Sequence, residues 1–116
     1  MSGTLGSLLL YDLRGMSVFE EVDADDWQSW IDDNAAIVLD VREPDEWERG
    51  TLPEAVLISQ GEIVEKVDEL DKGTPILCVC RSGNRSSNVA MFLHFNGFQV
   101  ANLQGGMKAL GLQERN

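Results

Sequence analysis

The chain reads ILCVCRSGNRSS from Ile76 to Ser87, and this stretch joins a strand pattern to a helix pattern. The apolar run of residues 76–79 predicts a buried strand, because a short apolar run bounded by turn residues is typical of one. The next residues are rich in Gly, Ser and Arg, which predicts a loop. The apolar segment that follows ends at Gly97 and has the length of a helix. Strand, loop and helix in this order indicate one unit of an α/β fold.

Cys80 lies at the end of the predicted strand, where the loop begins. A cysteine is a nucleophile only as its thiolate, which nearby cations and a helix amino terminus favour. Arg81 and Arg85 supply cations in the loop. Cys80 is therefore the candidate catalytic nucleophile. The alternative is an ordinary buried thiol in a strand.

The loop also has residues that suit a backbone curled around a negatively charged sulfur. Gly83 and Asn84 tolerate positive φ better than other residue types. Ser86, Ser87 and Asn88 are good capping residues, which predicts that the helix starts at Ser86. The loop amides and the helix terminus would then point at the sulfur and stabilise its charge.

Three motifs of this chain resemble those of the rhodanese-like domain family. CRSGNRS at residues 80–86 is similar to the family's active-site loop, and LDVREPDEW at residues 39–47 resembles its upstream signature. LQGGM at residues 103–107 is similar to its Gly-Gly segment. The motifs occur in the family's order and span roughly residues 18 to 112. The resemblance implies a three-layer α/β domain, with a central, mainly parallel sheet and helices on both faces.

The same resemblance implies a thiosulfate sulfurtransferase-like enzyme. The Cys80 thiolate would take a sulfane sulfur from thiosulfate or another persulfide donor, hold it as a persulfide, and pass it to a thiol or cyanide acceptor. The residues expected to bind substrate are Arg81, Ser82, Gly83, Asn84, Arg85 and Ser86. The expected partners are a small anionic sulfur donor, the acceptor, and a sulfur-relay protein. No cofactor or metal is expected.

The loop length favours sulfur transfer, although two features of the chain depart from the family pattern. The loop from Cys80 to Arg85 has the shorter, sulfur-handling length, since phosphatase relatives carry one more residue. The turn GTLPEA at residues 50–55 lacks the family's usual histidine, and the tryptophan usual after the Gly-Gly pair is absent. A non-catalytic module that binds an anion or a protein is the main alternative. A phosphatase or arsenate reductase is a weaker one.

Asp40 and Arg42 are expected to support the catalytic loop. They lie at the end of an apolar strand predicted over residues 36–41. Because parallel strands gather ligands at their carboxyl ends, both residues would come close to that loop. Asp40 is predicted to pair with an arginine such as Arg85. The alternative is that Asp40 hydrogen-bonds only within its own turn.

Length and charge limit the domain count and the partners. The chain has 116 residues, which predicts a single domain, expected at residues 17–116. Residues 1–16 precede the family resemblance and are expected to form a flexible extension. The net charge of −11 argues against nucleic acid or an anionic membrane as a partner. Eighteen of the twenty acidic residues lie between Glu20 and Asp71, and none lies between Lys72 and Gln113. The part that carries Cys80 is therefore locally cationic.

Cysteine and histidine are too few for a disulfide framework or a structural zinc site. The chain has two cysteines and one histidine. This usage favours a cytoplasmic location. Cys78 lies in the apolar strand, so core packing is the preferred interpretation. The alternative is a thiol that resolves the Cys80 persulfide.

The remaining pattern predicts strands that alternate with helices. An edge strand is expected at residues 18–22, and further strands at residues 55–58 and 98–103. Asp23 is expected to cap a helix, and Pro44 to stand first in a short one. Ser59 is expected to lead a helix with its apolar residues at Ile63, Val67 and Leu70.

Overall fold

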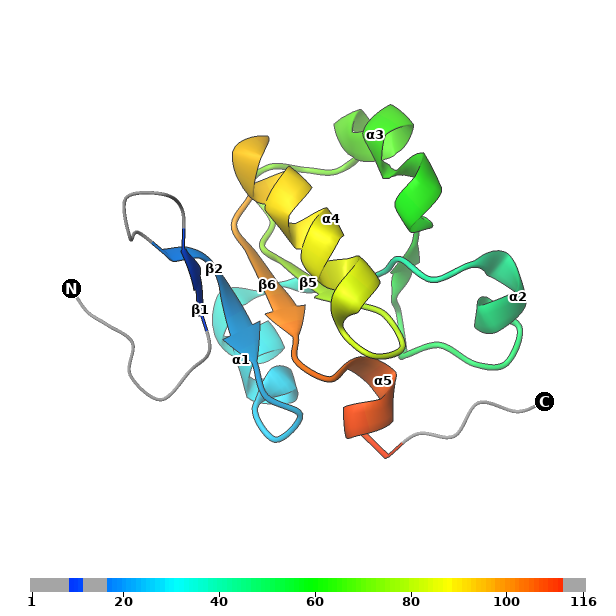
Figure 1. Ribbon diagram of the computed structural model, residues 1–116. Helices are drawn as coiled ribbons and strands as arrows, with labels where there is room; N and C mark the ends of the chain where they lie inside the picture. The colour runs from blue at the N-terminus through cyan, green and yellow to red at the C-terminus, as the bar shows by residue number, and fades with distance from the viewer. Residues whose placement is uncertain (1–8, 12–16, 112–116) are drawn as a thin grey trace.

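A six-stranded sheet forms the centre of the molecule in the computed structural model, which describes residues 9–11 and 17–111 (Figure 1). The strand order is β1-β2-β6-β5-β3-β4, and every neighbouring pair is parallel except β1 with β2. The elements in chain order are β1 (Leu9–Tyr11), β2 (Ser17–Val22), α1 (Trp27–Asn34), β3 (Ile37–Asp40), α2 (Pro44–Trp47), β4 (Val56–Leu57), the 3-10 turn η1 (Gln60–Glu62), α3 (Ile63–Lys66), the 3-10 turn η2 (Val67–Glu69), β5 (Ile76–Val79), α4 (Asn84–Phe95), β6 (Val100–Leu103) and α5 (Gly106–Ala109).

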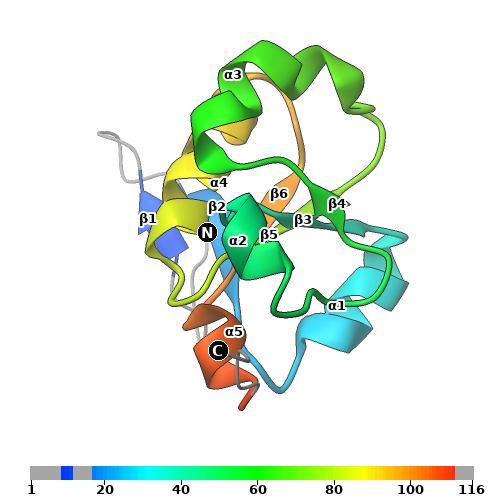
Figure 2. The ribbon, with the colours of Figure 1, turned by 90° about the vertical axis from the view of Figure 1, so that its right-hand side faces the viewer.

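Helices cover both faces of the sheet, which confirms the three-layer α/β fold expected from the sequence. Figure 2 shows the sheet between α3 and α4 on one side and α1 and α5 on the other. Successive side chains of a strand point to opposite faces. Ile76 and Cys78 of β5 therefore pack in the core beneath α4, and Leu77 and Val79 pack in the core beneath α1 and α5. All four are fully buried.

The expected strands and the helix at Pro44 are confirmed, but the helices expected after Asp23 and after Ser59 differ from expectation. The prediction that Asp23 caps a helix is wrong, because the Asp23 carbonyl accepts a hydrogen bond from Asp26 N–H in a turn, and Asp26 is the N-cap. The segment after Ser59 is not one helix but α3 between η1 and η2. No helix in the described part of the chain is long and apolar enough to cross a bilayer.

The prediction that β2 is an edge strand is wrong. β2 lies between β6, which it pairs with in parallel, and β1, which it pairs with in antiparallel fashion. The predicted flexible extension therefore contains a strand, Leu9–Tyr11. Its other residues lie outside the part of the chain that the structure describes.

Candidate functional site

The Cys80 side chain lies at the carboxyl end of β5, inside the loop that leads to α4. Its Sγ accepts hydrogen bonds from the Gly83 N–H at 3.1 Å, the Ser86 N–H at 3.4 Å and the Ser86 hydroxyl at 3.3 Å. The residue is 0% exposed. The sulfur is thus shielded from solvent, but some of the groups that surround it are hydrogen-bond donors.

These donors decide the ionisation of the thiol. Burial alone raises the pKa of Cys80, because it penalises the charged form. Hydrogen bonds from the Ser86 hydroxyl and from the amides of Ser86, Gly83 and Ser82 lower it, and together they outweigh burial. The pKa of Cys80 therefore lies below its ordinary value. This environment favours the thiolate.

Gly83 gives the loop its shape. Its φ is 101°, in the region that favours glycine, and it is the N-cap of α4. The helix begins at Asn84, so the prediction that Ser86, Ser87 and Asn88 cap it is wrong. Asn84 is the first helical residue and does not have the positive φ that the sequence suggested. Ser86 lies within the first turn, from which its hydroxyl reaches the sulfur.

The short helix α5, which the sequence did not predict, holds the other side of the loop. Met107 N–H donates to the Cys80 carbonyl at 2.9 Å, and Lys108 N–H donates to the Arg81 carbonyl at 3.0 Å. Figure 1 shows α5 beside the loop that precedes α4. A Cβ on Gly106 would collide with the Cys80 carbonyl oxygen and would lie 2.6 Å from the Arg81 carbonyl carbon. The Gly-Gly motif was thus the signal for this contact.

Asp40 and Arg42 form a buried pair with each other. The Arg42 Nη2 lies 2.9 Å from Asp40 Oδ2, and the Arg42 Nε donates to Oδ1 at 3.0 Å. The Arg42 Nη2 also donates to the Gly50 carbonyl at 2.7 Å. The prediction that Asp40 pairs with Arg85 is therefore wrong. Asp40 pairs instead with Arg42, two residues further along its own turn. The pair ties the end of β3 to the turn after α2.

Arg85 pairs with Glu46, a residue of the upstream motif that the sequence did not single out. The two Nη atoms of Arg85 lie 2.6 and 3.0 Å from the two carboxylate oxygens. The hydrogen bond from Arg85 is the main cause that lowers the pKa of Glu46 to about 2. Glu46 also accepts the Glu43 N–H at 3.0 Å in a capping box at the start of α2. The contact between Glu46 and Arg85 spans 39 residues of sequence, so local patterning could not reveal it.

Comparison with known proteins decides the family. The rhodanese-like domain model matches residues 23–112. The chain belongs to the rhodanese-like domain family.

Relatives and a solved structure agree with this assignment. YtwF of Bacillus subtilis, provisionally named a sulfurtransferase, is 44% identical over 77 residues, which cover 66% of this chain and 75% of that protein. The thiosulfate sulfurtransferase GlpE of Pseudomonas syringae is 29% identical over 94 residues, which cover 80% of this chain and 88% of that protein. The crystal structure of a rhodanese-related protein from Thermoplasma volcanium is similar with a TM-score of 0.72 and 31% identity, over 78% of this chain and 88% of that one.

The loop residues predicted to bind substrate differ in burial and in their contact with the Cys80 sulfur of this rhodanese-like domain. Gly83 and Ser86 are buried and contact the sulfur. Arg81, Ser82 and Asn84 are exposed. Arg85 is half-buried and held by Glu46. Gly83 and Ser86 therefore form an inner set that contacts the sulfur, whereas Arg81 and Asn84 face solvent. Ser82 is exposed, but its amide also donates to the sulfur.

Cys78 is a core residue of the rhodanese-like domain, as preferred from the sequence. It is fully buried in the cluster that includes Ile76, Val89 and Leu93. Burial, followed by the nearby Cys80, raises the pKa of Cys78 well above its ordinary value. A protonated thiol is a poor nucleophile, so this environment does not favour the alternative of a resolving cysteine.

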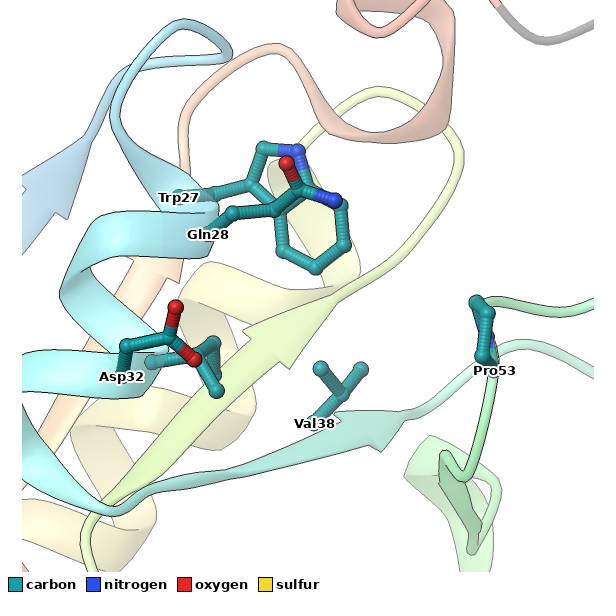
Figure 3. Close-up of a pocket in the computed structure, with 6 residues that line it drawn as sticks. Trp27, Gln28, Asp32, Val38 and Pro53 are labelled. Atoms are coloured by element: carbon teal, nitrogen blue, oxygen red, sulfur yellow. The ribbon is translucent and has the colours of Figure 1, made fainter.

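A groove of about 460 Å³ lies away from this site, on the α1 side of the sheet (Figure 3). Its walls come from α1, β3 and the turn before β4, and none of the lining residues belongs to the Cys80 loop. The lining residues are Trp27, Gln28, Ile31, Asp32, Val38 and Pro53.

The contact between Gly106 and the loop predicts the effect of a methyl group. In Gly106→Ala, strain from positive φ adds to a collision with backbone that cannot move aside, so we expect the free energy of unfolding to fall by about 3 kcal/mol. Gly111→Ala is the matched control, because Gly111 has φ 75° and open space around its Cβ position; it should cost about 1 kcal/mol. Urea denaturation measures both. Equal losses would contradict the contact.

The pair between Glu46 and Arg85 predicts a pH-dependent contribution to stability. Because folding lowers the pKa of Glu46 from 4.5 to about 2, the contribution is complete above pH 4.5 and is lost as pH falls towards 2. Glu46→Gln should therefore lower the melting temperature by several degrees at pH 6, for a loss of about 1 kcal/mol, and by much less near pH 3. The exposed neighbour variant Glu48→Gln should show no such trend. If the melting temperature of Glu46→Gln lay equally far below that of the wild type at pH 6 and at pH 3, the predicted pH dependence would be refuted.

Proposed function

We propose that this rhodanese-like domain is a sulfurtransferase that carries sulfane sulfur as a persulfide on Cys80. The observation that supports this most is the set of three hydrogen bonds to Cys80 Sγ, together with the lowered pKa of that thiol. These donors are neutral amides and a hydroxyl, so they stabilise the negative charge of the thiolate without protonating the sulfur. The names of the relatives, which include a thiosulfate sulfurtransferase, support the same reaction.

The reaction proceeds in two balanced steps. The Cys80 thiolate attacks the outer sulfur of thiosulfate or of a persulfide donor, a new S–S bond forms, and the donor leaves as sulfite or as a thiolate. The outer sulfur of the Cys80 persulfide is then attacked by cyanide or by an acceptor thiolate, which releases thiocyanate or a new persulfide and restores the Cys80 thiolate. The loop amides stabilise the anionic sulfur in each state.

Burial of the sulfur constrains how a donor reaches it. Because Cys80 is fully buried, a donor can reach its sulfur only if some of the residues that surround it move. Arg81 is exposed at the outer edge of the loop, whereas Arg85 is held by Glu46. We therefore assign the first contact with an anionic donor to Arg81. Arg85 has the role of fixing the start of α4 against α2.

Burial of the Cys80 sulfur also fits one alternative function. A sulfur that is covered by its own loop is also compatible with a non-catalytic module, in which the exposed loop residues bind an anion or a partner protein. In that case the lowered pKa of Cys80 would be a by-product of the loop's conformation.

Mass spectrometry of the intact protein distinguishes the two functions. After incubation with thiosulfate, or in parallel with inorganic polysulfide, the wild type should gain one sulfur atom, and added cyanide should remove it as thiocyanate. Cys80→Ser should gain none. Cys78→Ala is the control that removes the other thiol, and it should behave as the wild type does. A wild type that gains no sulfur from either donor, or a Cys80→Ser protein that gains as much, would contradict the sulfurtransferase.

A further inference from the structure

Asn102 is a polar residue in a buried strand, and its side chain reaches the Cys80 loop. It lies in β6 and is 2% exposed, with the other three residues of the strand also buried. Its Nδ2 donates to the Gly83 carbonyl at 3.2 Å, across 19 residues of sequence. A buried amide is costly unless it is hydrogen-bonded, so these contacts account for its place in the core.

Gly83 joins this contact to the sulfur. Its N–H donates to Cys80 Sγ, and its carbonyl accepts from Asn102 and from the Ser87 N–H, which lies 3.2 Å away. The two groups belong to one residue with φ 101° and ψ −8°. A change in the direction of the carbonyl therefore turns the backbone that aims the N–H at the sulfur.

Glu21 fixes the orientation of the Asn102 amide. The two residues are opposite each other in the pairing of β2 with β6, and Asn102 Nδ2 donates to the Glu21 Oε1 and Oε2 atoms at 3.0 and 3.2 Å. A flipped amide would set Oδ1 against the carboxylate and the Gly83 carbonyl. In the observed orientation the buried Oδ1 has no hydrogen-bond partner among the described residues. The hydrogen bonds of Nδ2 thus determine the orientation of the amide and leave Oδ1 without a partner among the described residues.

We propose that Asn102 is a positioning residue for Cys80: oriented by Glu21, it holds Gly83 so that the Gly83 N–H stays on the sulfur. Asn102 does not touch the reacting atoms. Its importance for sulfur transfer rests on the proposed function, but its effect on the thiol does not. The chain of contacts runs from Glu21 through Asn102 and Gly83 to Cys80.

The pH dependence of Cys80 alkylation by iodoacetamide tests this, because it reports the thiolate fraction without any sulfur donor. Peptide fragmentation assigns the label to Cys80 rather than Cys78. In Asn102→Ala we expect the apparent pKa to rise by about one pH unit, which corresponds to one weakened hydrogen bond to a charged group. Val100→Ala is the control for a cavity in the same strand. It should lose stability and leave the apparent pKa unchanged.

Variants of Glu21 separate positioning from a direct effect of charge. Removing a nearby negative charge would by itself lower the pKa of a thiol. If Glu21 acts by orienting Asn102, Glu21→Ala should instead raise the apparent pKa of Cys80, by about half a pH unit. Glu21→Gln keeps an acceptor oxygen and should not raise it. These variants leave Asn102 in place, so they test the proposal even if Asn102→Ala does not fold.

The proposal is overturned if Asn102→Ala and Glu21→Ala keep the profile of the wild type or shift it downward. It is also overturned if Val100→Ala raises the apparent pKa as much as Asn102→Ala does. Failure of the wild type to form a persulfide is a separate result that would remove the proposed function. The alkylation profiles would still decide the role of Asn102.

Discussion

The hydrogen bonds to the Cys80 sulfur are the interaction on which the account of this site depends. A fully buried thiol would ordinarily stay protonated, as the raised pKa of Cys78 illustrates in the same core cluster. Cys80 differs because it lies just past the end of the strand, where the amides and hydroxyl of the following turn are near. Burial opposes the charged form of the thiol, and the hydrogen bonds from these donors outweigh it. Two positions along the chain therefore separate a thiol whose pKa is raised from one whose pKa is lowered.

Aligned donors require a fixed backbone, and several contacts around the loop supply it. The α5 amides hold the carbonyls of Cys80 and Arg81, and Asn102 holds the carbonyl of Gly83. The ion pair between Glu46 and Arg85 ties the start of α4 to α2. All of them contact residues of the turn from Cys80 to Arg85, whose amides face the sulfur.

The sequence was sufficient for the features that depend on local patterning. The apolar run of residues 76–79 predicted β5 and its buried position, and the residues after Cys80 predicted a loop whose amides point at the sulfur. Contacts between distant segments could not be predicted in this way. Asp40 had two arginines that the sheet topology could bring near, and only the structure shows that Arg42 satisfies it. Glu46 and Asn102 reach the loop from 39 and 19 residues away, and α5 has only 4 residues, too few to display a helical period.

The most direct test of the account is the pKa of Cys80 itself, measured from thiolate absorbance or alkylation rate against pH in the wild type and in Ser86→Ala. The Ser86 hydroxyl is the largest of the contributions that lower this pKa. The account predicts a wild-type pKa below that of a free cysteine and a clear rise in Ser86→Ala, with Ser87→Ala one position along the helix left at the wild-type value. An ordinary or raised pKa in the wild type, or no change in Ser86→Ala, would contradict it.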